Sequence, residues 1–110
     1  MSVLGAMLFD ESALARCLEM LRPFYFYDDP HQKIFSAIQA LFEKNQAVDL
    51  VTVSEELRKR KQLEEVGGAS YLTALTAAVP TAVNVEHYAQ IVKEKALLRR
   101  LIATASQILQ

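Results

Sequence analysis

Residues 84–110 read NVEHYAQIVKEKALLRRLIATASQILQ, and this stretch decides the fold of the chain. It contains no glycine or proline, so no residue in it favours breaking a helix. Apolar side chains recur at three- and four-residue spacing, which places them along one side of a helix. These residues are Leu97, Leu98, Leu101, Ile102, Ala105, Ile108 and Leu109. The sequence therefore predicts one long helix with an apolar face near its C-terminal end.

The expected length of this helix sets the overall shape. At about 1.5 Å per residue it is roughly 40 Å long. A compact domain of about 100 residues is only ~28 Å across, taken as twice its radius of gyration. We therefore expect the helix to project beyond the body of the protein. An uncovered apolar stripe of this kind usually marks an association surface.

Composition restricts the class of protein. The 110 residues suffice for one domain with a single core, and 52% hydrophobic with 23% charged residues is typical of a globular protein. A net charge of −1 does not provide the positive field of a nucleic-acid-binding protein. No apolar run approaches the roughly 20 residues that cross a bilayer. Cys17 is the single cysteine, which favours a reducing, cytoplasmic setting. Met1 leads almost directly into an apolar helical pattern, which suggests a fragment of a longer protein.

Helix start and stop signals divide the rest of the chain, and strand alternation is nearly absent. Asp10, Asp29 and Asn84 are expected N-caps, and Thr52 has capping-box spacing to Glu55. The predicted helices cover 2–8, about 11–22, 30–45, 53–61 and 69–78, with Pro23 and Pro80 closing two of them. The fold class is all-α. A compact multi-helix head (1–83) precedes the long helix (84–110).

The expected core follows from the apolar faces of these helices. They are predicted to bury Val3, Leu4, Met7, Leu8, Leu14, Cys17, Leu18, Leu21, Ile34, Phe35, Ile38, Leu41, Phe42, Val53, Leu57, Leu72, Leu75 and Val79. The aromatic segment FYFYDDP (24–30) is expected to cross the core as an ordered loop.

No catalytic constellation is present in the sequence. It has no G-x-x-x-x-G-K-[ST] loop for nucleotide phosphates. His31 and His87 lack companions at metal-ligand spacing, and Cys17 lies in an apolar helix face, where it is expected to be a small buried hydrophobe. We expect no enzyme activity, no metal and no cofactor.

Charge runs offer one alternative function. Arg58, Lys59, Arg60 and Lys61 form the strongest basic run, which a small helix-turn-helix DNA-binding domain could use. Acidic neighbours on both sides cancel its field, which favours a solvated helix end. Arg99 and Arg100 interrupt an apolar stretch, and arginine in that position can bridge to a carboxylate on a partner.

Tyr71 follows the glycine pair Gly67-Gly68, which is expected to form a turn with unusual backbone angles. One interpretation makes this tyrosine a partly exposed anchor for a partner. The other packs it on its own helix with its hydroxyl in water. The residues alone do not separate the two.

Four stretches taken together resemble the N-terminal domain of the bacterial replicative DNA helicase, the DnaB family. They are SVLGAMLFD, LRPFYFYDDPHQKIFSAI, VDLVTVSEELRKRKQLEEVGGASYL and AVPTAVNVEHYAQIVKEKALLRRLI, in the family's order and over nearly the whole chain. The segment PFYFY departs from the family, which more often has an acidic residue before FY. The family's leading segment and its second hairpin arm are also missing.

The resemblance implies a helical head followed by the first arm of a hairpin that pairs between subunits into a hexamer collar. It implies that the collar receives the C-terminal helicase-binding domain of primase, at Tyr71, Ile102 and Ile108 by matching motif. Oligomerisation would bury Leu98, Leu101, Ile102 and Ala105. The ATPase belongs to another domain of the family, and no direct contact with DNA or a membrane is expected. Whether a helicase loader shares the surface, and which face of the helix pairs, stays open.

Overall fold

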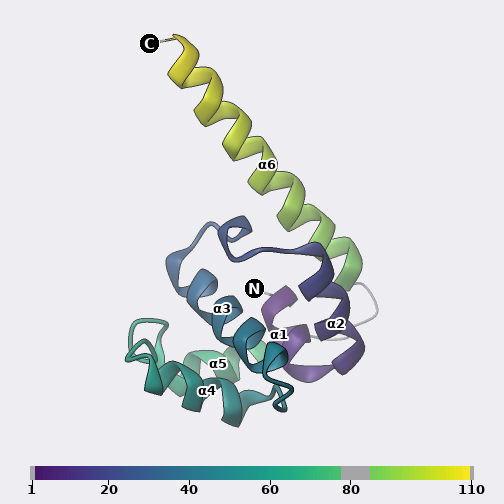
Figure 1. Ribbon diagram of the computed structural model, residues 1–110, viewed down its shortest axis with the longest axis vertical. Coiled ribbons are helices and arrows are strands. Elements are labelled where there is room, and N and C mark those ends of the chain that lie inside the picture. The colour runs from purple at the N-terminus through teal and green to yellow at the C-terminus, as the bar shows by residue number, and fades with distance from the viewer. Residues whose placement is uncertain (1, 78–84, 110) are drawn as a thin grey trace.

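The structure, a computed structural model, describes residues 2–77 and 85–109. This part of the chain contains six α-helices, one short 3₁₀ helix and no strand, so the all-α prediction is confirmed. The elements are α1 (Ser2–Phe9), α2 (Glu11–Met20), η1 (Pro23–Tyr25), α3 (Asp29–Glu43), α4 (Leu50–Lys59), α5 (Gly68–Ala77) and α6 (Val85–Leu109). The first five α-helices form a head, and α6 extends away from it (Figure 1).

The core of the head is built around α1. This helix is apolar on nearly every side, and residues 3–8 are all buried. A helix without a polar face is stable only when it is surrounded, and α1 contacts α2, α3, α5 and α6. The largest fully buried side chains of the other elements are Leu21, Phe26, Ile34, Phe35, Ile38, Val53, Leu57 and Leu72.

Helix starts were predicted with mixed success. Asp10 caps α2 as expected, because its carboxylate accepts a hydrogen bond from the Ala13 N–H at 3.0 Å. The predicted capping box at Thr52 is wrong. Asp49 is the N-cap of α4, and its carboxylate and the Thr52 hydroxyl each accept the other residue's backbone N–H at 2.9 Å. In α3 the cap position is Asp28, one residue before the expected Asp29.

The inward faces were predicted well except at their edges. Phe42 is 45% exposed, contrary to expectation. It lies about 80° around the helix axis from Ile34, at the border of the buried stripe. Leu18 is only half-buried for a similar reason. The expectations for Val79, Pro80 and Asn84, and the head boundary at 83, fall outside the described residues.

Helix α6 has two halves with different surroundings. Val85, Ala89 and Ala96 are buried against the head, where α6 contacts α1, α2 and η1. Every described residue from Leu97 onward is exposed. With 25 residues the helix is about 37 Å long, and the whole molecule measures 47 Å along its longest axis. The expected projection is therefore present (Figure 1). Among the described residues, no helix is long and apolar enough to cross a membrane.

Candidate interaction surfaces

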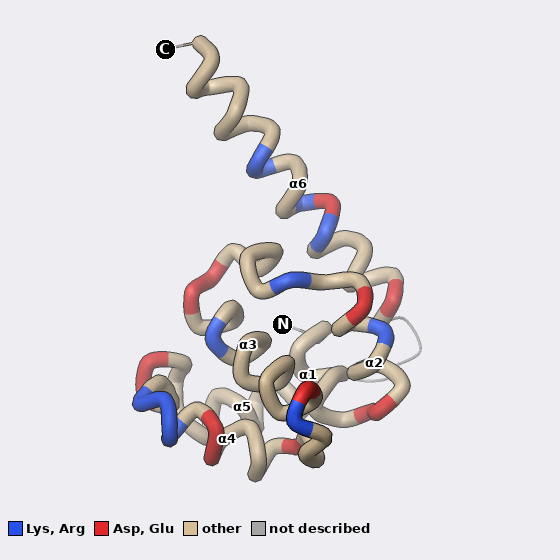
Figure 2. The backbone as a smooth tube through the Cα atoms, viewed as in Figure 1, with Lys and Arg blue, Asp and Glu red and all other residues tan. Residues whose placement is uncertain are grey.

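The projecting half of α6 carries the largest run of exposed apolar side chains in the described structure. Leu98 is 56% exposed, Leu101 65%, Ile102 59% and Ile108 77%, and Ala105 is also exposed. Residues 101–109 hold no charged side chain, so the end of the helix is uncharged over more than two turns (Figure 2). We call this solvent-exposed surface, formed by Leu98, Leu101, Ile102, Ala105 and Ile108, the α6 stripe.

Arg99 and Arg100 attach α6 to the head at the point where the helix leaves the head. The Arg99 guanidinium donates a hydrogen bond to the Tyr25 carbonyl oxygen at 2.9 Å and lies 5.3 Å from the centre of the Tyr27 ring. Arg100 lies 5.3 Å from the ring centre of Phe24. These are cation–π distances. The arginine pair, expected to reach a partner's carboxylate, is thus occupied within the chain.

Tyr71 is held in place by a residue that the sequence did not indicate. Its hydroxyl lies 2.7 Å from Nε2 of His31, and the two rings stack with 6.1 Å between their centres. The ring is half-buried against the core. The hydroxyl is therefore bonded to protein rather than free in water. His31 and Tyr71 lie 40 residues apart, and no motif or spacing could have paired them.

The glycine turn also positions Tyr71. Gly67 has φ +106° and Gly68 φ +76°, as expected for a turn of unusual backbone angles. A Cβ atom on Gly67 would lie 2.8 Å from Cβ of Tyr71, closer than real side chains approach. The glycine hydrogen is thus what allows the tyrosine to lie against this turn. Beside it is an open hollow of about 400 Å³, lined by Asp28, Pro30, His31, Glu65, Val66, Gly67 and Tyr71.

Two neighbouring influences act on the His31 imidazole in opposite directions. Burial lowers its pKa, and the Asp28 carboxylate, 3.4 Å from Nδ1, opposes that shift. With a proton on Nδ1 directed at Asp28, Nε2 accepts the hydrogen bond that the Tyr71 hydroxyl donates. In the described residues, no three His, Cys, Asp or Glu side chains gather where they could hold a metal ion.

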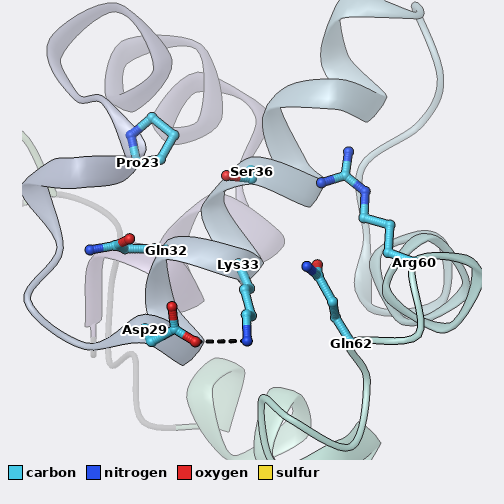
Figure 3. Close-up of a pocket in the computed structure, with 7 residues that line it drawn as sticks. All are labelled: Pro23, Asp29, Gln32, Lys33, Ser36, Arg60 and Gln62. Atoms are coloured by element: carbon cyan, nitrogen blue, oxygen red, sulfur yellow. Dashed lines mark ion pairs between the residues drawn. The ribbon is translucent and has the colours of Figure 1, made fainter.

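A second hollow, of about 200 Å³, lies between α3 and the segment after α4 (Figure 3). Lys33 points into it and pairs with Asp29 at 2.7 Å, and it pairs equally closely with Glu65. Arg60 pairs with Glu56 at 2.8 Å. Both cations are thus offset by carboxylates, and the hollow offers no concentrated positive charge to a phosphate.

Two of the four cations in the basic run at the end of α4 are paired in the same way. Arg58 pairs with Glu55, and Arg60 with Glu56, on the same helix. Each carboxylate has a lowered pKa because it accepts hydrogen bonds from its arginine. A DNA-recognition helix needs unpaired donors on its exposed face. The pairing of both arginines with carboxylates therefore weakens the helix-turn-helix alternative.

The predicted primase residues do not lie together. Tyr71 is on α5 in the lower part of the head, whereas Ile102 and Ile108 are on the free end of α6 at the top (Figure 1). A chain of contacts links the two regions. The Tyr71 hydroxyl lies 2.7 Å from His31, which lies 3.4 Å from Asp28, and the ring of the preceding Tyr27 lies 5.3 Å from the Arg99 guanidinium, about one helical turn before Ile102.

Comparison with known proteins identifies this arrangement. The family model described as the DnaB-like helicase N terminal domain matches residues 1–94. The chain belongs to this family. Replicative DNA helicase DnaB of Geobacillus stearothermophilus is 54% identical over 99% of the chain, and replicative DNA helicase DnaC of Bacillus subtilis is 52% identical over the same share. The chain spans about a quarter, 24%, of the length of each of these relatives.

Solved structures agree with the fold. The N-terminal domain of DnaB helicase from Mycobacterium tuberculosis superimposes with a TM-score of 0.96 at 48% identity, covering 99% of this chain and 78% of that one. A DnaB-like replicative helicase described with its interactions with primase superimposes with a TM-score of 0.86 at 31% sequence identity, covering 98% of this chain and 25% of that one. The N-terminal domain of DnaB helicase from Helicobacter pylori, also described with its interactions with primase, superimposes with a TM-score of 0.81 at 26% sequence identity. The match covers 96% of this chain and 82% of that one.

These matches fix what the 110 residues are. They form a DnaB-like N-terminal domain and do not include an ATPase motor, whereas the full-length relatives are helicases. The absence of a phosphate-binding loop from the sequence agrees with that assignment.

Proposed function

We propose that this chain serves a hexameric replicative helicase as a non-catalytic collar domain that self-associates through α6 and docks primase. The observation that carries the proposal is the α6 stripe, which is exposed, uncharged and held clear of the head. A soluble domain gains by burying such a surface against another protein. The proposed setting is the cytoplasm, as part of DNA replication.

Self-association would use Leu98, Leu101, Ile102 and Ala105. These residues share one side of the helix at the spacing of an antiparallel or parallel helix pair. Burying ~400 Å² of apolar surface per helix supplies about 10 kcal/mol before the costs of association. That gain suffices when several copies are tethered in one ring and is marginal for two free chains.

Primase docking would use Tyr71, Ile102 and Ile108, with the helicase-binding domain of primase as the partner. Two structural relatives are described with primase interactions, which supports this choice of partner. Because Tyr71 is on α5 of the head and Ile102 and Ile108 are on the projecting part of α6, we infer that in the assembled collar a docked domain contacts Tyr71 of one copy and α6 of another. Docking and self-association are then coupled.

Calorimetric titration of this chain with the helicase-binding domain of the matching primase tests docking. We expect heat with a defined stoichiometry for the parent chain and weaker binding for Tyr71→Ala and Ile102→Asp. Gln107→Asp is the matched control, since it adds the same charge to an exposed position on the side of α6 away from Leu98 and Ala105. Equal loss from Gln107→Asp would refute a specific role for the stripe.

Sedimentation velocity of the same variants tests self-association separately. We expect the parent chain and Gln107→Asp to show the same concentration-dependent increase in sedimentation coefficient, and Ile102→Asp to stay monomeric. A parent chain that remains monomeric at high concentration, yet binds primase, would reject self-association through α6 and keep docking.

A further inference from the structure

A third surface lies on the head and includes neither residues of α6 nor residues of the hollow beside Tyr71. It is a groove of about 550 Å³ between the α1–α2 junction and the loop from α3 to α4. These segments lie at the end of the head opposite the tip of α6 (Figure 1). The groove is lined by Leu8, Phe9, Glu11, Leu14, Phe42, Gln46, Ala47, Val48 and Asp49.

Two phenylalanines form the walls of this groove and remain in water. Phe9 is 65% exposed and Phe42 45%, although both stand next to the core. Phe9 ends the wholly apolar α1, and Phe42 ends the buried stripe of α3. Aromatic side chains that line one hollow and are exposed to solvent are typical anchors of protein interfaces.

The rim of the groove is acidic. Glu11 and Asp49 line it, Asp10 lines a small hollow that adjoins it, and neither set of lining residues contains a lysine or arginine. One carboxylate oxygen of Asp10 and one of Asp49 accept the N-cap hydrogen bonds of α2 and α4. The positive ends of these two helix dipoles offset about one of the three negative charges of Asp10, Glu11 and Asp49. The nearest cations along the chain are Arg16, which pairs with Glu86, and Lys44, which lies two residues from both Phe42 and Gln46. The residues that line the groove therefore carry a net negative charge beside apolar side chains.

We propose that this groove docks an amphipathic helix of a partner protein that presents apolar side chains flanked by lysine or arginine. The apolar side chains would fill the space between Phe9 and Phe42, and the basic ones would meet Glu11 and Asp49. Helix-in-groove binding of this kind combines a hydrophobic anchor with charges that set orientation. The negative rim disfavours nucleic acid and anionic lipid, whose phosphates it repels.

A second copy of this chain is a poorer occupant. Its exposed apolar helix is the end of α6, and the arginines beside that end are Arg99 and Arg100. Both are engaged with the aromatic segment of their own head. They cannot reach another copy's rim without giving up those contacts.

The probe is a synthetic 15-residue helix of leucine, alanine and lysine, titrated into the isotope-labelled chain and followed by amide chemical shifts. We expect shifts at residues 7–14 and 42–50, and binding at least tenfold tighter than that of the same peptide with glutamate in place of lysine. Phe9→Ser and Phe42→Ser should each weaken binding about tenfold, as hot-spot truncations do. Val51→Ser, which removes a 77% exposed side chain outside the groove, should leave it unchanged.

The charge contribution is tested without disturbing the fold. Glu11→Gln with Asp49→Asn removes two rim charges while asparagine retains the N-cap of α4. We expect about threefold weaker binding for this double variant. Shifts confined to α6, or equal binding of the lysine and glutamate peptides, would overturn the proposal. So would a dimer in sedimentation that Phe9→Ser dissociates, because that result assigns the groove to a second copy.

Discussion

The closeness of Gly67 to Tyr71 permits a test of how the turn holds the tyrosine. In Gly67→Ala the new Cβ would start 2.8 Å from the Tyr71 Cβ, and ordinary contact requires at least 3.4 Å. Either the turn or α5 must therefore move by several tenths of an ångström. The alanine would also keep φ near +106°, outside the regions open to L-residues.

The magnitude follows from these two effects. A non-glycine residue at such a φ costs about 1–3 kcal/mol, and a weakened Tyr71–His31 hydrogen bond adds about 1 kcal/mol. We expect Gly67→Ala to lower the free energy of unfolding by about 2–4 kcal/mol in total. Gly68→Ala is the matched control. Its φ is +76° and no atom lies within 4 Å of its Cβ, so only the backbone cost of about 1–2 kcal/mol applies.

Urea unfolding followed by far-ultraviolet circular dichroism measures both variants. For a chain of this size, each kcal/mol lost from the free energy of unfolding lowers the melting temperature by about 4 °C. A thermal scan therefore gives an independent value of the loss in stability. Docking of primase at a temperature where both variants are folded should be weaker in Gly67→Ala than in Gly68→Ala. If the two variants lose the same stability within about 0.5 kcal/mol, steric contact with Tyr71 is not what selects glycine at position 67.

Three further expectations concern His31, Cys17 and Asp49. Burial lowers the pKa of His31 in the fold, so as the pH falls the unfolded chain binds a proton at His31 before the folded chain does. The free energy of unfolding should therefore fall as the pH drops below about 6.5. Urea titrations between about pH 7.5 and 5.5 should show that His31→Gln loses this dependence. Burial raises the pKa of the fully buried Cys17 thiol to about 11, so iodoacetamide should modify it at pH 8 only after denaturation, as mass spectrometry would show. Asp49→Ala should cost about 1 kcal/mol through loss of the cap, and Asp49→Asn much less, by urea unfolding.

The sequence predicted those features that depend on local pattern. The periodic apolar faces of α2 and α3 and the cap at Asp10 each follow from residues a few positions apart. The length and exposed face of α6 also follow, because no breaker occurs in it and the chain is too short to cover it. Where two local patterns compete, local reasoning failed. Thr52 fits the spacing of one capping box with Glu55 and of another with Asp49, and only the packing of α4 decides.

The features that define the surfaces are non-local and could not be predicted. Tyr71 and His31 meet across 40 residues, and Arg99 meets the Tyr25 carbonyl across 74. Either arginine could equally have faced a partner, which is how the sequence was interpreted. Phe42 was expected in the core, because periodicity does not show where a buried stripe ends. The groove that it forms with Phe9 arises only once α1 and α3 are packed.

The arginine attachment explains how one helix packs on the head and still presents the α6 stripe in a fixed direction. Residues 101–109 alone are too few for a stable helix in water, where about 12–15 residues are marginal. They stay helical because they continue a helix whose first half is buried and whose middle is fixed by Arg99 and Arg100 on the aromatic segment. The same contacts fix the direction in which the α6 stripe leaves the head. The proposed collar would need every copy to present that stripe at one angle, since a symmetric ring closes only at a fixed rotation. The aromatic segment adds little to the core beyond Phe26, and its main structural effect is to fix the orientation of α6.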